Sequence, residues 1–146
     1  MTMRVYMDNC CFNRPYDDPL HVPNWLEAEA KMYVQRQIRA GEIELAWSYM
    51  LDHENADNPY EHRRDAIAQW KTLAVADVDE DDAIIRLAKD IAQCGIRHKD
   101  ALHVACAIKA QCHVFLTTDK GILKKKVEGI LFMNPLDFVG GMENKT

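Results

Sequence analysis

The sequence lacks a long apolar segment and an excess of basic residues. No stretch approaches the roughly 18 uninterrupted apolar residues that a membrane-spanning helix needs. The first ten residues contain an arginine and an aspartate where a signal peptide would have an apolar core. The formal net charge of -5 at pH 7 argues against a global basic surface for nucleic acid, although it leaves room for a local basic patch. We therefore expect a cytoplasmic protein without membrane association.

The five cysteines lack the spacing of a disulfide framework or of a zinc site. Cys10 and Cys11 are adjacent, whereas Cys94, Cys106 and Cys112 lie far downstream and form no CxxC pair. An odd number of thiols in this arrangement fits a reducing compartment and argues against structural zinc. We expect most of these cysteines to be small core residues.

The composition is that of a folded protein with one core of ordinary size. The chain has 146 residues, and its 48% of hydrophobic residues place it among globular rather than disordered proteins. No internal repeat or linker divides it. We predict one domain over residues 1–139, followed by a loose tail over residues 140–146.

Short apolar runs alternate with helical patterns along the chain. Strands are predicted at residues 3–7, 42–47, 114–116 and 130–133. Helices are predicted at residues 24–41, 48–54, 58–70, 79–95, 97–110 and 121–127. The acidic run at residues 77–82 is interpreted as the start of a helix, where acids favourably oppose the macrodipole. Strands that alternate with helices predict a three-layer α/β/α fold with a central parallel sheet.

Four acids fall where a predicted strand ends or a helix begins: Asp8, Glu54, Asp100 and Asp119. Ligands bind open parallel sheets outside the carboxyl ends of the strands, so these acids could converge in one crevice. Each acid alone also has an ordinary structural explanation, such as a helix cap or a solvated position. Glu54 in particular competes with Asp52, two residues away on nearly the opposite face of the helix.

Converging carboxylates repel one another and raise some pKa values unless a cation compensates their charge. Oxygen ligands without cysteine or histidine spacing favour Mg²⁺ or Mn²⁺ over zinc. Such an ion can activate water and stabilise the leaving oxygen of a phosphodiester, so the quartet predicts a metal-dependent nuclease.

Several motifs together resemble the PIN-domain ribonucleases over nearly the whole chain. They are Met7-Asp8-Asn9, Ser48 with Glu54 six residues later, Asp100-Ala-Leu-His-Val-Ala at a helix start, and Leu-Thr-Thr-Asp119 closing a strand. The resemblance implies a PIN-like fold and a Mg²⁺- or Mn²⁺-dependent endonuclease acting on single-stranded RNA. It further implies the toxin of a type II toxin-antitoxin pair, often homodimeric and held inactive by a protein antitoxin.

Carried over by position, Asp8, Glu54, Asp100 and Asp119 match the family's catalytic and metal-binding acids. Thr117 matches the threonine two residues before the last acid. The chain departs from the family at Asn9, where Thr or Ser is common, and at Gly121, where many members carry another acid. Asn9 can still bind a metal water or a phosphate. The departure at Gly121 weakens the case for a second metal ion, so we expect one ion and leave a second open.

Basic residues near the acids are candidates for binding substrate. Arg14 could bind a phosphate with its planar fork of donors, or pair equally well with Asp17 or Asp18. The lysines at 124–126 are interpreted as a solvated helix end rather than an RNA guide. His53, His98 and His103 flank the acids without the spacing of zinc ligands.

Other phosphoryl-transfer enzymes fit the sequence less well. Cys10 stands where a haloacid-dehalogenase-like phosphatase needs a second aspartate, and Tyr16 and Asp17 stand where a low-molecular-weight tyrosine phosphatase needs arginine. No Walker A sequence and no adjacent His-Asp pair exists. A catalytically inactive PIN-like binding scaffold remains the alternative function, with its acids serving as caps.

Overall fold

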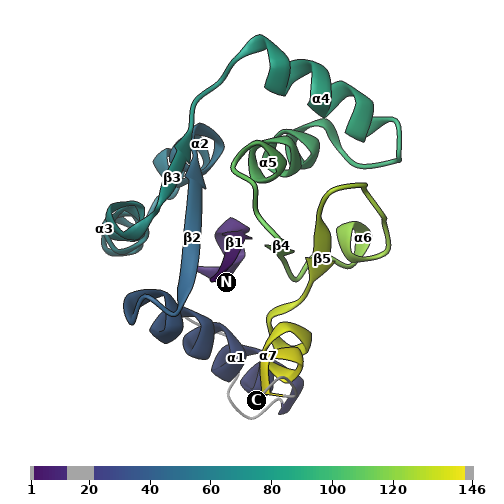
Figure 1. Ribbon diagram of the computed structural model, residues 1–146. Helices are drawn as coiled ribbons and strands as arrows, with labels where there is room; N and C mark the ends of the chain where they lie inside the picture. The colour runs from purple at the N-terminus through teal and green to yellow at the C-terminus, as the bar shows by residue number, and fades with distance from the viewer. Residues whose placement is uncertain (1, 13–21, 144–146) are drawn as a thin grey trace.

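A five-stranded parallel sheet forms the centre of the protein (Figure 1). The computed structural model describes residues 2–12 and 22–143. The strands are β1 (Met3–Met7), β2 (Ile43–Ser48), β3 (Ala76–Val78), β4 (Val114–Leu116) and β5 (Leu131–Met133). Their order across the sheet is β3-β2-β1-β4-β5, and every neighbouring pair is parallel. The predicted α/β fold is confirmed.

Helices cover both faces of this sheet. α1 (Val22–Arg39) and α7 (Pro135–Glu143) lie on one face, while α4 (Asp82–Ala92) and α5 (His98–Lys109) lie on the other (Figure 1). The remaining helical segments are η1 (Asn9–Cys11), α2 (Tyr49–Ala56), α3 (Glu61–Trp70), η2 (Lys71–Leu73) and α6 (Lys120–Leu123). Within the described ranges, no helix combines the length and apolar character needed to cross a membrane.

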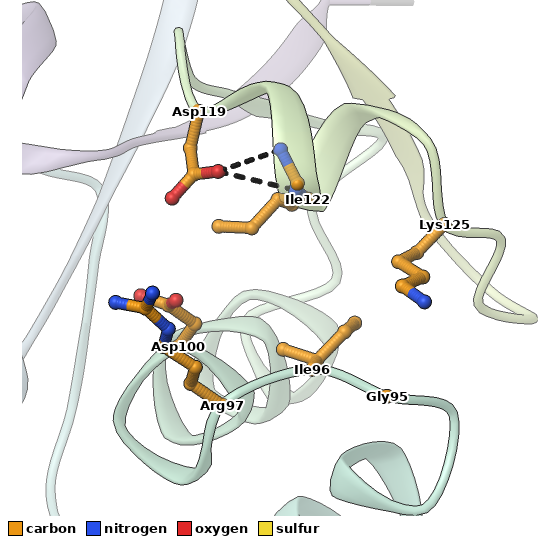
Figure 2. Close-up of a pocket in the computed structure, with 8 residues that line it drawn as sticks. Gly95, Ile96, Arg97, Asp100, Asp119, Ile122 and Lys125 are labelled. Atoms are coloured by element: carbon orange, nitrogen blue, oxygen red, sulfur yellow. Dashed lines mark hydrogen bonds between the residues drawn. The ribbon is translucent and has the colours of Figure 1, made fainter.

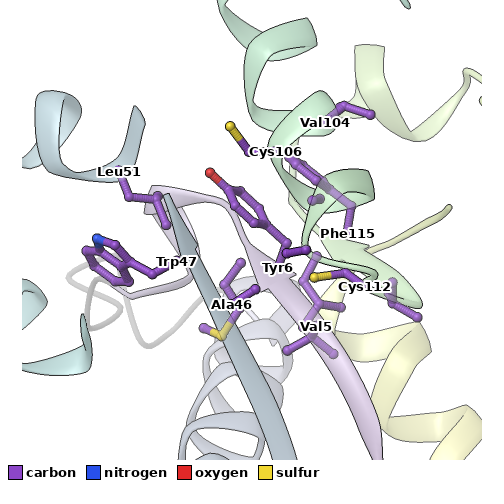
Figure 3. Close-up of a cluster of buried hydrophobic side chains, with 14 of the residues drawn as sticks. Val5, Tyr6, Ala46, Trp47, Leu51, Val104, Cys106, Cys112 and Phe115 are labelled. Atoms are coloured by element: carbon purple, nitrogen blue, oxygen red, sulfur yellow. The ribbon is translucent and has the colours of Figure 1, made fainter. Parts of the chain in front are cut away.

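The central strands are buried on both faces over most of their length, which explains why their sequences are largely apolar. Val5, Tyr6 and Met7 of β1 are at most 1% exposed, and the Tyr6 ring stacks on Phe115 of β4 with 5.3 Å between ring centroids (Figure 3). Three of the five cysteines, at 11, 106 and 112, are buried as predicted, while Cys10 is half-buried and Cys94 is exposed.

The structure differs from the predicted elements mainly where an element is short or weakly patterned. β3 was not predicted, because it has only three residues and lies at the edge of the acidic run. α7 was not predicted either, and it extends to Glu143, so residues 140–143 are helical where a loose tail was expected. α1 begins at Val22 rather than Asn24, α3 begins at Glu61, and α6 ends at Leu123.

The strand order reverses between β1 and β4. From β1 the chain adds β2 and then β3 on one side, and it returns across the sheet to place β4 and β5 on the other. Crevices at such reversals, beyond the carboxyl ends of the strands, are where doubly wound sheets bind ligands. Asp8 follows β1 and Asp119 follows β4, so both acids border this position.

Candidate functional site

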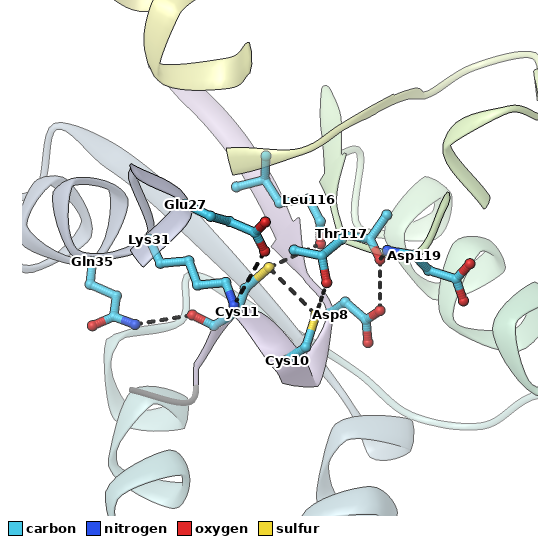
Figure 4. Close-up of polar contacts among 10 residues, drawn as sticks. Asp8, Cys10, Cys11, Glu27, Lys31, Gln35, Leu116, Thr117 and Asp119 are labelled. Carbon is cyan, nitrogen blue, oxygen red and sulfur yellow. Dashed lines mark hydrogen bonds and ion pairs between the residues drawn. The ribbon is translucent and has the colours of Figure 1, made fainter. Parts of the chain in front are cut away.

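Hydrogen bonds join the ends of β1 and β4 at the reversal point. The Asp8 amide donates to the Leu116 carbonyl at 2.9 Å. The buried Thr117 hydroxyl donates to Asp8 Oδ2 at 2.9 Å and accepts from the Asp119 amide at 3.1 Å (Figure 4). Thr117 therefore fixes the orientation of the Asp8 carboxylate and the position of the Asp119 backbone.

The other contacts of these two acids are caps of short helical segments. Asp8 Oδ1 accepts from the Asn9 amide at 2.7 Å at the start of η1. Asp119 Oδ1 accepts from the amides of Gly121 at 2.8 Å and Ile122 at 3.3 Å (Figure 2). Its Oδ2 has no hydrogen-bond partner among the described residues. That oxygen is available for a ligand.

Asp100 lies in the first turn of α5 and is electrostatically coupled to the other three acids. Burial raises the pKa of Asp100 most, the charges of Asp8, Asp119 and Glu54 raise it further, and His103 opposes them. Asp8 after β1, Asp119 after β4 and Glu54 in α2 therefore all contribute to the negative charge around Asp100. Within the described ranges, Asp8, Asp100 and Asp119 make no ion pair with lysine or arginine.

Glu54 faces α5, and its surroundings differ from those of the other acids. Its carboxylate accepts a hydrogen bond from His103 Nε2, and Lys99 Nζ lies 4.0 Å from Glu54 Oε1. Burial raises the pKa of Glu54, but the hydrogen bond and charge of His103, with Lys99, outweigh burial and lower it overall. Asp52 instead accepts from Trp47 Nε1 at 2.9 Å and from Lys71 at 3.0 Å. Glu54, rather than Asp52, is therefore the α2 acid that acts on Asp100.

A buried polar network supports Glu54 from behind. His103 Nδ1 and the Tyr6 hydroxyl lie 2.6 Å apart, and the same hydroxyl lies 2.6 Å from Ser48 Oγ. All three residues are at most 1% exposed, and burial raises the pKa of Tyr6 well above 10, so the phenol stays neutral. The network joins α2, α5, β1 and the end of β2.

This network was not predicted from the sequence. His103 was noted only as lacking metal-ligand spacing, and Ser48 only as the start of a predicted helix and as part of a motif with Glu54. Ser48 does occupy the N-cap position of α2, but its hydroxyl makes no cap bond there. The available signal was the position of His103 three residues after Asp100, on an adjacent part of the same helix.

Of the three predicted substrate-binding residues, two can be located. Thr117 contacts Asp8, as described above. Asn9 Oδ1 is buried and lacks a hydrogen-bond partner among the described residues, which leaves an acceptor beside Asp8 without a donor. A buried acceptor of this kind needs a water or ligand donor. Arg14 lies outside the described residues.

The donor chemistry of the site fits a hard divalent cation. The available ligands are carboxylate and amide oxygens, which suit Mg²⁺ or Mn²⁺. Within the described part of the chain, no three His, Cys, Asp or Glu side chains form a ready metal-holding group. A site with fewer than three protein ligands is compatible with Mg²⁺, which commonly uses one or two carboxylates and completes its shell with waters and substrate phosphate.

Comparisons with known proteins bear on the fold. No protein-family model matches the sequence. No curated protein sequence matches it. A chain in the crystal structure of VapBC2 from Rickettsia felis bound to a DNA fragment from their promoter is similar, with a TM-score of 0.55 and 13% sequence identity. The match covers 90% of this chain and 98% of that chain. The similarity supports the α/β fold, is consistent with a PIN-like arrangement, and at this identity shows the fold alone.

Proposed function

We propose that this protein is a Mg²⁺- or Mn²⁺-dependent endoribonuclease that cleaves single-stranded RNA. The observation that carries the proposal is Asp100 near the sheet's reversal point, whose pKa is raised by burial and by the charges of Asp8, Asp119 and Glu54 from separate segments. Three of the acids, Asp8, Asp100 and Asp119, lack a lysine or arginine partner within the described ranges. Such an arrangement is costly for folding alone, because it places like charges together. A site for a cation and a phosphodiester explains it.

In this proposal Asp8, Asp100 and Asp119 are the ligands of the ion, directly or through its water molecules, and Glu54 completes the acidic group. The bound ion would polarise the phosphate and lower the pKa of a water molecule. Thr117 holds the Asp8 carboxylate in one orientation through its hydroxyl. His103 holds Glu54 toward α5. Asn9, whose backbone amide donates to Asp8 Oδ1, stands beside this carboxylate and can bind a metal water or a phosphate.

We further propose that the protein is the toxin of a type II toxin-antitoxin pair, acts in the cytoplasm as a homodimer and is held inactive by a protein antitoxin. The resemblance to PIN-domain ribonucleases and the similarity to a chain of VapBC2 support this assignment. A hollow of about 310 Å³ between α1 and α7 offers a surface for a partner, and it includes the exposed Leu26 and Leu136. Expression without an antitoxin gene should arrest growth; normal growth would contradict the toxin assignment.

Cleavage of defined RNA tests the enzymatic proposal directly. Purified protein should cleave single-stranded RNA in Mg²⁺ or Mn²⁺ and lose this activity in EDTA. Asp8→Ala, Glu54→Ala and Asp100→Ala should each abolish it. Cleavage at the wild-type level in EDTA, or in these three variants, would refute the proposal.

A catalytically inactive binding scaffold is the second candidate function. It is favoured by the caps that Asp8 and Asp119 form and by the contact between Glu54 and His103, since these contacts give three of the acids structural roles. Calorimetric titration with Mn²⁺ separates the two functions. An enzyme should show a binding heat that disappears in Asp8→Asn and Asp100→Asn, whereas a scaffold should show no site-specific heat in any of the three proteins.

A further inference from the structure

A cavity of about 160 Å³ opens directly beside two of the acids, between the start of α5 and α6 (Figure 2). Asp100 and Asp119 line it together with the cations of Arg97 and Lys125, and Ile96 and Ile122 provide apolar walls. An engineered protein cavity of about 150 Å³ accepts benzene, so this volume has room for one ring-sized group. The cavity is continuous with the proposed cleavage site through its two acids.

The side chains of Arg97 and Lys125 have no charged partner among the described residues. Neither Arg97 nor Lys125 makes an ion pair or side-chain hydrogen bond with any other described residue. Lys125 is half-buried, whereas Lys124 and Lys126 on either side of it are exposed and do not line the cavity. From the sequence, residues 124–126 were interpreted as a solvated helix end. In the structure, Lys125 differs from its two neighbours because it lines a cavity.

Gly95 makes room for Lys125. A Cβ atom at position 95 would lie 2.8 Å from Lys125 Nζ, closer than real side chains approach one another. Gly95 also has a φ of +92°, a conformation that side chains disfavour. The lysine ammonium thus lies against bare backbone, and a side chain at position 95 would push it away. The absence of a side chain helps to build the cationic end of the cavity.

We propose that this cavity binds a phosphate group of the RNA chain next to the phosphodiester that is cleaved, with Arg97 and Lys125 as its donors. The inference rests on the proposed nuclease function. Arginine binds phosphate with a planar fork of donors, and lysine binds it as a point charge. Asp100 and Asp119 line the same cavity, so a phosphate bound here places its neighbour on the chain near these acids. Ile96 and Ile122 suit the apolar face of a ribose or base.

Binding measured without cleavage tests this subsite. The probe is a single-stranded RNA hexamer with a 3′ fluorophore. Its binding is measured by fluorescence anisotropy in EDTA over a range of salt concentrations. Lys125→Gln and Arg97→Gln should each weaken binding about tenfold and reduce the salt slope by about 0.7, the value for one phosphate contact on a single strand. Lys126→Gln removes the same charge one residue away from Lys125, and it should change affinity less than about twofold.

A charge-neutral variant provides a second test. Gly95→Ala should displace the Lys125 ammonium and weaken hexamer binding as Lys125→Gln does. Gly129→Ala is the matched control, because Gly129 has a φ of +96° but no atom within 4 Å of its Cβ position. Both alanine variants strain the backbone similarly, so only Gly95→Ala should change the affinity for RNA. Thermal unfolding of each variant verifies that it is folded.

The source of the phosphate is resolved by comparing hexamers with a 5′-hydroxyl and a 5′-phosphate. Loss of affinity with both probes identifies an internal phosphate, and loss with the phosphorylated probe alone identifies a terminal one. Equal affinities for Lys125→Gln and Lys126→Gln, with wild-type protein that binds and cleaves RNA, would overturn the subsite alone. Wild-type protein that neither binds nor cleaves the hexamer would overturn the nuclease function as well.

Discussion

Two groups of acids in this protein carry like charges but have different partners. Asp52 and Asp77 share Lys71, whose Nζ lies 3.0 Å from Asp52 Oδ2 and 3.6 Å from Asp77 Oδ2. The carboxylates of Asp8, Asp100 and Asp119 at the reversal point have no such cation within the described ranges, and the pKa of Asp100 is raised. The first group is compensated within the fold. The second retains a negative field that a ligand can use.

The comparison teaches that the partners of acidic residues, rather than their number, distinguish a candidate site. Pairing with Asp52 and Asp77 raises the pKa of Lys71, with the hydrogen bond from Lys71 to Asp52 as the largest cause. Perturbed carboxylates in a crevice are candidates for function, whereas exposed ion pairs are ordinary features of protein surfaces.

The largest expected difference between the groups is in RNA cleavage. Asp100→Asn should reduce the rate in Mn²⁺ at least about a hundredfold, since even residues that only support metal ligands contribute up to this factor. Asp52→Asn and Asp77→Asn, which make the same chemical change in the compensated group, should cleave at nearly the wild-type rate. Comparable losses from all three substitutions, measured in a single-turnover assay, would remove the distinction.

Removal of His103 should have the next largest effect, on stability. His103→Ala removes one hydrogen-bond partner from Glu54, which keeps Lys99, and one from the buried Tyr6 hydroxyl, which keeps Ser48. Loss of a partner from a buried polar group costs about 1 to 3 kcal/mol. We expect the free energy of unfolding in urea to fall by about 3 kcal/mol. His62→Ala, at an exposed position of α3, is the control and should change it by less than about 0.5 kcal/mol. A His103→Ala protein as stable as the control would show that the network contributes little.

A smaller effect should appear in the dependence of stability on pH. The raised pKa of Asp100 means that its negative charge destabilises the native state at neutral pH, and that this cost disappears as pH falls below the raised pKa. Metal-free Asp100→Asn should therefore be more stable than wild type at pH 7, by less than about 1 kcal/mol after solvent screening. The gain should vanish in acid.

Glu54→Gln should behave in the opposite way. Because the pKa of Glu54 is lowered, its charge stabilises the native state above its usual pKa, and this contribution is lost as pH falls through the lowered value. Melting temperatures of wild type and both variants between pH 3 and 7 test the two signs. A stabilising Glu54→Gln at pH 7 would contradict the role of His103 as its partner.

The smallest effect is expected at Lys71. Its ion pairs are exposed, with 43% of the lysine side chain accessible, and such pairs contribute a few tenths of a kcal/mol, at most about 1. Lys71→Gln should therefore lower the melting temperature only slightly, and 0.5 M salt should remove the difference from wild type. A large loss of stability that persists in high salt would show that the compensated group has a larger structural role than its exposure indicates.

The fold was predictable to the extent that its elements were long or fully apolar. The strand at Met3–Met7 was predicted with the bounds that the structure has, because a short apolar run broken only by Arg4 is typical of a strand buried on both faces. β3 and α7 were missed, because β3 is three residues long and α7 contains two glycines in a segment that suggested a loose end. In the structure β3 pairs with β2, and α7 packs against α1. These contacts join segments far apart in the sequence, so the local residue pattern does not reveal them.

Some residues of the candidate site were likewise predictable from local sequence, and others were not. Asp8 and Asp119 were placed by the ends of strands, and Asp100 by the first turn of a helix, all of which are local features. The choice between Glu54 and Asp52 depended on which partner each side chain meets, His103 from α5 or Lys71 from η2. Those partners are 49 and 19 residues away along the chain, so spacing could not identify them.

The sequence by itself determined the layered α/β class, the parallel sheet and the acids at its carboxyl edge, because hydrophobic period and strand ends are local properties of the chain. Only the tertiary structure decided which acids have partners, which lysine of residues 124–126 enters a cavity, and why position 95 is glycine. Charge compensation and cavity walls arise between segments far apart in sequence. They exist only once the sheet has brought those segments together.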